Sequence, residues 1–196
     1  APTTTVPLPT TTTTTTTTMP GIAAVTAADL GSSWRPGCPV DPADLAAVTV
    51  RHLTFEGSAA EGTIVVHADV AADVRAVFAR LWEIGFPISQ VVPVDRFGSS
   101  DDASMAANNT SGFNCRLTTG GSRWSEHAYG RAIDVNPIQN PYVRGATILP
   151  PAGSTYVDRS VTQPGMVTPE VVAAFAAVGW SGGGHWSSPD YQHFST

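Results

Sequence analysis

Two short motifs carry imidazole and carboxylate groups at spacings that suit metal binding. In the first motif, His127 and Asp134 stand seven residues apart with Gly130 between them. In the second, His193 follows Asp190 by three residues. Two imidazoles and one carboxylate match a catalytic zinc, which takes three protein ligands and keeps a fourth position for water, and a second carboxylate remains for proton transfer.

The residues around the first motif predict how its side chains are presented. Residues 131–135 alternate as in a strand, so Asp134 can face a cleft while its apolar neighbours anchor the strand. Gly130 allows the backbone to turn sharply between His127 and that strand. The approach of His193 depends on tertiary structure, which the spacing alone does not determine.

Other segments predict the scaffold. Alternating residues at 48–55 and 62–68 favour a β-hairpin, and 86–94 is typical of a buried strand. Apolar residues at helical spacing predict helices at about 70–84 and 169–178. We therefore expect an α+β fold, with a small, mainly antiparallel sheet, flanking helices and a metal cleft.

Polar segments at 95–112 and 136–151 are expected to form long loops that wall this cleft. Residues 1–30 begin with a Thr/Pro-rich tract and are expected to form a disordered tether, which leaves 31–196 as one domain. Such tracts are typical of extracellular stalks.

Composition limits the classes of partner. The chain has 42% hydrophobic and 13% charged residues, enough for one ordinary core. Its net charge of -6 and dispersed basic residues argue against nucleic-acid binding. No apolar run approaches the ~20 residues of a membrane-spanning helix.

Cys38 and Cys115 are the two cysteines. In an oxidising compartment the simplest interpretation is that they pair with each other, and two buried free thiols are the alternative. A bridge would close a loop of about 76 residues, worth roughly 4 kcal/mol in the chain-entropy model.

The pattern Ser-x-His-x-x-Gly-x-Ala-x-Asp at 125–134, followed by Asp-x-x-His at 190–193, resembles peptidase family M15, the zinc D,D-peptidases of bacterial cell walls. This family includes the VanX and VanY enzymes and the L-alanyl-D-glutamate endopeptidases of phage endolysins. The resemblance extends over about 78–194, where 113–116 is also similar. It implies a D,D-peptidase-like fold, shared with the hedgehog signalling domain, and a zinc peptidase domain at 31–196 with its core at 78–194.

The resemblance also implies roles for individual residues. The zinc ligands would be His127, Asp134 and His193. Asp190 would take a proton from the attacking water and pass it to the leaving amine. Arg116 resembles the arginine that stabilises the negative tetrahedral intermediate, with an ion pair to a loop aspartate as the alternative.

The sequence gives a less specific signal for the residues expected to bind substrate, which are Ser125, Tyr129, Asn109 and Trp186. For Ser125, Tyr129 and Asn109, a purely structural role is an equally open interpretation. His185 is the main rival to the three expected metal ligands.

These inferences predict a secreted, monomeric zinc metallopeptidase that acts on the stem peptides of peptidoglycan in the cell wall. Both a D-alanyl-D-alanine carboxypeptidase and an L-alanyl-D-glutamate endopeptidase agree with the motifs. The alternative is a non-catalytic, zinc-containing module of the same fold that binds the cell wall or acts in signalling. Retention of a proton-carrying carboxylate and of Arg116 argues against that alternative.

Overall fold

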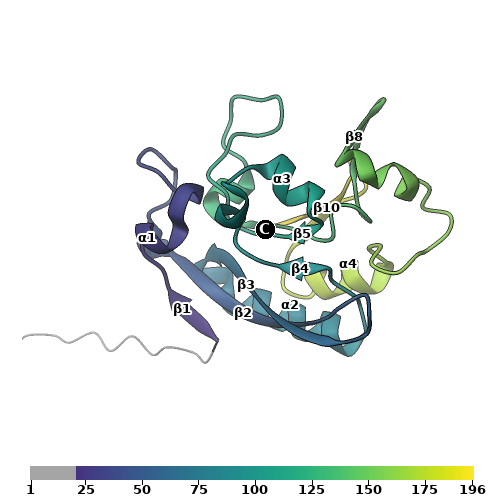
Figure 1. The fold of residues 1–196 in the computed structure, drawn as a ribbon, viewed down its shortest axis with the longest axis horizontal. Helices are drawn as coiled ribbons and strands as arrows, with labels where there is room; N and C mark the ends of the chain where they lie inside the picture. Colours follow the sequence, from purple (N-terminus) through teal and green to yellow (C-terminus); the bar gives the residue numbers. More distant parts are fainter. Residues whose placement is uncertain (1–20) are drawn as a thin grey trace, which may run out of the picture.

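The computed structural model describes residues 21–196, and Figure 1 shows how their elements are arranged. The helices are α1 (Ala27–Leu30), α2 (Ala71–Glu83), α3 (Asp101–Ala106) and α4 (Pro169–Ala176). The strands are β1 (Ile22–Ala24), β2 (Leu45–Leu53), β3 (Ala59–His67), β4 (Gln90–Val91), β5 (Asn109–Thr110), β6 (Ala132–Asp134), β7 (Tyr142–Arg144), β8 (Thr147–Leu149), β9 (Ser181–Gly183) and β10 (Asp190–Ser195).

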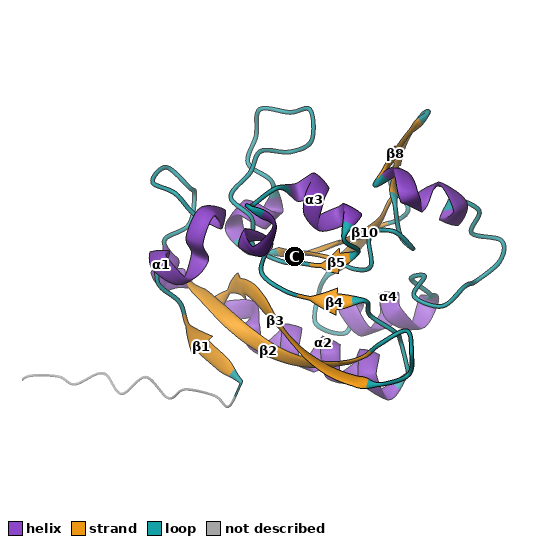
Figure 2. Cartoon of the chain, viewed as in Figure 1, coloured by secondary structure: helices purple, strands orange, loops and turns teal. Residues whose placement is uncertain are grey.

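The strands form three small sheets. The first has the order β1-β2-β3, the second runs β6-β10-β7-β8 with β9 also paired to β10, and both are antiparallel. A short parallel pair, β4-β5, lies between them in the view of Figure 2. The expected mixture of helices with antiparallel strands is confirmed, but the expectation of one sheet is wrong.

The predicted hairpin and both predicted helices are present. β2 and β3 pair antiparallel over their full length, from Leu45 opposite His67 to Leu53 opposite Ala59. Helix α2 packs against this hairpin and buries a stripe of apolar side chains at helical spacing. This apolar stripe is what the sequence pattern detects, because a helix is stabilised mainly by burying one face.

The main core joins the two larger sheets. It contains apolar residues of β2, β3, α2, α4, β6 and β10. Within it, Phe175 of α4 stacks on Phe194 of β10 with ring centroids 3.8 Å apart and an interplanar angle of 8°. Because Phe194 follows His193 directly, this stack fixes the strand that carries one of the expected ligands.

Three segments differ from the prediction. Only Gln90–Val91 of the expected strand 86–94 is a strand, because Pro87 and Pro93 cannot donate to a sheet. The expected loop 95–112 contains α3, whose first turn is capped by the Ser100 hydroxyl. The expected loop 136–151 contains the hairpin β7-β8.

The predicted tether falls partly within the described residues. Ile22–Ala24, assigned to it from the sequence, pairs with β2, and Ala27–Leu30 forms α1 with a capping box between Thr26 and Asp29. The Thr/Pro-rich residues 1–20 lie outside the described part of the chain. Within residues 21–196, no helix has both the length and the apolar character needed to cross a bilayer.

Cys38 and Cys115 form a disulfide bond between positions 77 residues apart in sequence. Its reduction is expected to lower the free energy of unfolding by roughly 4 kcal/mol, because the bond restricts the unfolded chain. Thermal unfolding with and without reductant measures the effect, and a Cys38→Ser/Cys115→Ser variant should no longer respond to reductant. Equal midpoints for the wild type under both conditions would contradict the expectation.

Candidate metal centre

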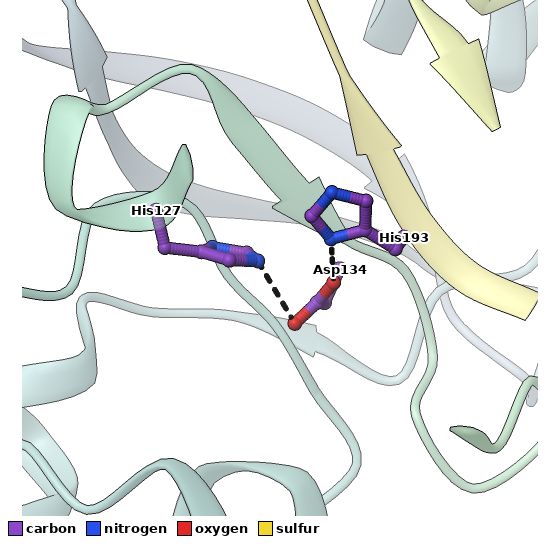
Figure 3. A group of neighbouring side chains, drawn as sticks. All are labelled: His127, Asp134 and His193. Atoms are coloured by element: carbon purple, nitrogen blue, oxygen red, sulfur yellow. Dashed lines mark hydrogen bonds and ion pairs between the residues drawn. The ribbon is translucent and has the colours of Figure 1, made fainter. Parts of the chain in front are cut away.

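Three side chains from distant parts of the chain meet at one point. His127, Asp134 and His193 each offer one ligand atom, and these atoms all lie within 4.8 Å of one another. Nε2 of His127 is 3.2 Å from Oδ2 of Asp134, and Nδ1 of His193 is 3.2 Å from Oδ1 of the same carboxylate (Figure 3). Asp134 therefore lies between the two imidazoles and presents one oxygen to each.

The register of the second sheet brings two of these residues together. His193 of β10 and Asp134 of β6 are direct partners across the antiparallel pair. Side chains of directly opposed residues lie close together on one face of a sheet. The motif at 190–193 thus meets the motif at 125–134 through strand pairing, which sequence spacing alone does not reveal.

The third residue, His127, is held by a 3₁₀ turn at Glu126–Tyr129. The Ser125 hydroxyl caps this turn by accepting from the His127 backbone N–H, at 3.3 Å. Gly130 ends the turn with φ of +69°, and a Cβ there would stand 2.6 Å from the His67 backbone nitrogen. Gly130 is therefore required both for its conformation and for close packing on β3.

The imidazole of His127 is oriented by the backbone. Its Nδ1 lies 2.7 Å from the carbonyl oxygen of Gly112, which can only accept, so Nδ1 carries a proton. Gly112 itself packs tightly on β3, where an added Cβ would stand 2.3 Å from the Val65 carbonyl oxygen. This arrangement directs Nε2 toward Asp134, as the outer hydrogen bond of a metal-binding histidine does.

Burial makes the charges in this cluster strongly interdependent. All three side chains are buried. Burial works to raise the pKa of Asp134, but the two neighbouring imidazoles outweigh it and hold that pKa well below its usual range. Burial likewise works to lower the pKa of His127, and the Asp134 carboxylate more than reverses this effect. The metal-free cluster therefore favours an ionised Asp134 beside a protonated His127.

The donor set fits a divalent cation. Nε2 of His127 is buried and lies 3.2 Å from the Asp134 carboxylate without the geometry of a good hydrogen bond, so its lone pair can turn to an ion placed between the two groups. Two imidazole nitrogens and a carboxylate oxygen are ligands that zinc prefers, and three protein ligands are typical of its catalytic sites. Among the His, Cys, Asp and Glu residues of 21–196, these three side chains form the group whose ligand atoms lie close enough together to hold an ion.

A cavity of about 470 Å³ opens onto the cluster. This is a volume typical of small-molecule and peptide-binding sites. Beyond the three residues of the cluster, its lining residues are Asp101, Met105, Arg116, Thr118, Thr119, Ser125, Glu126, Tyr142, Leu149, Trp186, Ser187, Ser188, Asp190 and Gln192. Both expected catalytic residues, Asp190 and Arg116, are among them.

Asp190 lies in a low-dielectric environment. Its Oδ1 atom is buried without a hydrogen-bond partner among the described residues. Burial, followed by repulsion from Asp134, raises the pKa of Asp190 to about 7. A carboxyl group whose pKa lies near neutrality can both accept and return a proton under physiological conditions.

Arg116 is fixed by an aspartate, which was the alternative left open by the sequence. Its Nε lies 2.9 Å from Oδ1 of Asp101, and its Nη1 donates to the Leu117 carbonyl oxygen at 3.3 Å. Both Arg116 and Asp101 also line the cavity, so the ion pair and a role in the site are compatible. Burial raises the pKa of Asp101 against the opposing effect of Arg116.

The four expected substrate-binding residues separate into two groups. Ser125 and Trp186 line the cavity, and the exposed Trp186 ring lies 5.3 Å from that of His193. Tyr129 is exposed and is not among the lining residues. Asn109 is fully buried, and its amide bonds the backbone of Val92 on both sides, so it stabilises the 92–109 region instead of reaching a ligand.

The cavity also contains residues that the sequence did not single out as site residues. Glu126 and Gln192 lie within the two motifs, and Asp101 lies in the segment 95–112, which the sequence predicts to be a long loop. For Glu126 and Gln192, the available signal in the sequence is that each directly precedes a predicted metal ligand. His185, the rival ligand, is exposed and is not a member of the cluster found within residues 21–196.

The raised pKa of Asp190 predicts that the metal-free protein loses stability as the pH rises from about 4 to about 7. In this window the folded state retains a proton that the unfolded chain releases, so raising the pH favours unfolding. Asp190→Asn removes the ionisation, and its gain in unfolding midpoint over the wild type should be larger at pH ~7.5 than at pH ~4.5. An equal difference at both pH values, in chelator-treated protein, would contradict the assignment.

A buried two-histidine, one-aspartate site that lines a cavity, with a further carboxylate beside it, is typical of metal-dependent hydrolases. The comparison with protein families agrees, since residues 119–196 match a family model described as D-alanyl-D-alanine carboxypeptidase. This match covers the C-terminal part of the chain, including all three clustered residues and Asp190, and it supports membership of peptidase family M15. No curated protein and no solved structure matches the chain.

Proposed function

We propose that this protein is a secreted zinc metallopeptidase that hydrolyses a bond in the stem peptide of peptidoglycan. The observation that carries the proposal is the buried meeting of His127, Asp134 and His193 at a cavity, inside the region that matches the peptidase family. The disulfide bond supports an oxidising, extracellular location. The Thr/Pro-rich residues 1–20 agree with a cell-wall environment.

In this proposal His127, Asp134 and His193 hold the ion. Zinc bound there would supply the Lewis acidity that makes water a competent nucleophile near neutral pH. The Gly112 carbonyl keeps the proton of His127 on Nδ1 and so keeps Nε2 available as a ligand. The strand pairing of β6 with β10 sets the separation of the other two ligands before the ion binds.

Asp190 and Arg116 supply the remaining chemistry. Asp190 accepts the proton of the attacking water and delivers it to the departing amine, a task that suits a carboxyl group with a pKa of about 7. Arg116 faces the same cavity and stabilises the negative oxygen that develops on the scissile carbonyl. Asp101 holds the Nε side of its guanidinium, which leaves Nη2 for the substrate.

The geometry agrees with either position of cleavage. A D-alanyl-D-alanine carboxypeptidase and an L-alanyl-D-glutamate endopeptidase need the same ion, proton carrier and oxyanion partner. The cavity volume of about 470 Å³ accepts a few residues of peptide at a time.

Digestion of purified muropeptides tests the proposal. The full chain loaded with zinc should release products that mass spectrometry assigns to one bond, and treatment with a chelator should abolish them until zinc is restored. Loss of a terminal D-alanine identifies the carboxypeptidase, whereas separation of L-alanine from D-glutamate identifies the endopeptidase. The absence of any product with zinc bound would refute the peptidase proposal.

A further inference from the structure

Residues 31–38, which follow helix α1, contact both segments that carry the ion pair of the cavity wall. That pair is formed by Arg116 and Asp101, with Nε of the arginine 2.9 Å from Oδ1 of the aspartate. Residues 31–38 do not themselves line the cavity, and they precede the region 119–196 that matches the family model. Their contacts therefore act on the cavity only through the residues that they hold.

The residue before Arg116 is held by this segment at each of its polar groups. The backbone N–H of Cys115 donates to the carbonyl oxygen of Ser33 at 3.1 Å. The carbonyl oxygen of Cys115 accepts from Nη1 of Arg35 at 2.7 Å. Its sulfur forms the disulfide bond with Cys38. The peptide unit that leads into Arg116 is therefore restrained by three separate bonds.

The same segment is hydrogen-bonded close to Asp101. The hydroxyl groups of Ser32 and Ser99 lie 2.7 Å apart, and the Ser99 hydroxyl donates to that of Ser33 at 3.2 Å. The next residue, Ser100, caps the first turn of helix α3, which begins at Asp101. Both members of the ion pair thus follow, within two residues, a position that this segment holds.

The residues on either side of Cys115 bond to the turn that carries a metal ligand. The backbone N–H of Asn114 donates to the carbonyl oxygen of His127, and the carbonyl oxygen of Arg116 accepts from the backbone N–H of Ser125, both at 3.1 Å. The backbone at 114–116 therefore connects the metal-binding turn with the segment 31–38. A shift of this segment would move Arg116 relative to the metal ligands.

We infer that residues 31–38 are a positioning element for Arg116, acting through the Cys115 backbone and through the residues that precede Asp101. A misplacement of about 1 Å in a group that meets the reacting atoms can cost as much as 100-fold in rate, so restraints at a distance from the reaction affect turnover. The catalytic consequence rests on the proposed function, whereas the restraint on the backbone does not.

Arg35→Met tests the inference with the disulfide bond intact. It removes the donor to the Cys115 carbonyl oxygen and should lower kcat roughly 10-fold, with KM and zinc content unchanged, because oxyanion stabilisation acts in the transition state. Arg35→Lys retains a charged donor and should recover much of the loss. The matched control is Arg80→Met, the same change at an exposed arginine of α2 outside the cavity, which should keep wild-type kcat.

A double-mutant cycle shows whether the effect passes through Arg116. Arg116→Ala alone should lower kcat about 100-fold, as expected for the loss of an oxyanion partner. Adding Arg35→Met to it should cause no further loss, because the group that is positioned is absent. An equal loss from Arg35→Met with and without Arg116→Ala overturns the inference, as does wild-type kcat in Arg35→Met itself.

Amide hydrogen exchange tests the restraint without substrate. In the zinc-loaded full chain, Arg35→Met should speed exchange of the Cys115 amide roughly 10-fold, while the amides of α2 exchange as in the wild type. Unchanged exchange at Cys115 overturns the restraint. A wild-type protein that cleaves no muropeptide refutes the proposed function, and exchange still decides whether residues 31–38 hold this backbone. If Arg35→Met does not fold, Arg35→Gln, whose shorter side chain carries no charge, replaces it in each experiment.

Discussion

Asp134→Asn is expected to remove metal binding and peptide hydrolysis together. Asp134 presents one oxygen to His127 and the other to His193, and both contacts are 3.2 Å long. An amide lacks the negative charge with which the Asp134 carboxylate would offset that of a buried divalent ion. Changes to outer partners of a metal site already cost 10- to 100-fold in affinity, so loss of this ligand should cost more than about 100-fold.

Titration of the purified protein with zinc against a competing chelator measures this effect, and muropeptide digestion follows activity in the same samples. The matched control is Asp158→Asn, which changes an exposed aspartate outside the cavity and should retain wild-type affinity. Wild-type affinity in Asp134→Asn would mean that the ion is bound elsewhere.

The cluster could be anticipated from the sequence because its ligands belong to two short motifs. His127 and Asp134 are joined by a tight turn, whose glycine the sequence displays at Gly130. The sequence does not determine how His193 approaches them, since nothing in its spacing specifies a partner strand. The structure supplies the missing step through the pairing of β10 with β6.

The walls of the cavity were harder to anticipate. Arg116 and Asp101 form an ion pair across 15 positions of sequence, and Asp101 lies in the segment 95–112 that was expected to be a long loop. Asn109 belongs to the same region, yet the parallel pairing of β4 with β5 buries it completely. Such contacts depend on long-range pairing of very short strands, which leave little periodic pattern in the sequence.

The helices and strands of the scaffold also differ in how well the sequence predicts them. Helix α2 and the hairpin β2-β3 are long enough for apolar periodicity to identify them, and their bounds agree with the prediction within a few residues. Helix α3 has only six residues. Its formation depends on the Ser100 cap and on the burial of Met105, so tertiary packing rather than local preference decides it.

Asp190→Ala is expected to lower kcat by about 10²- to 10⁴-fold, the contribution typical of a general acid–base residue. Zinc affinity should remain at the wild-type level, because Asp190 is not one of the three clustered residues. A lower kcat with unchanged zinc affinity distinguishes a proton carrier from a metal ligand, since removal of a ligand changes both kcat and zinc affinity. Asp102→Ala, at an exposed aspartate near the cavity, is the control and should leave both unchanged.

The same variant separates an enzyme from a non-catalytic zinc module of similar architecture. A binding module has no need for a desolvated carboxyl group with a pKa of about 7, because keeping such a group in the folded state reduces stability at neutral pH. A cost of this kind is explained if the group transfers protons. If wild type and Asp190→Ala bind cell wall equally and neither releases a product, the carboxyl group has no catalytic role and the module is the better interpretation. If only the wild type releases products while both bind zinc equally, Asp190 carries the proton.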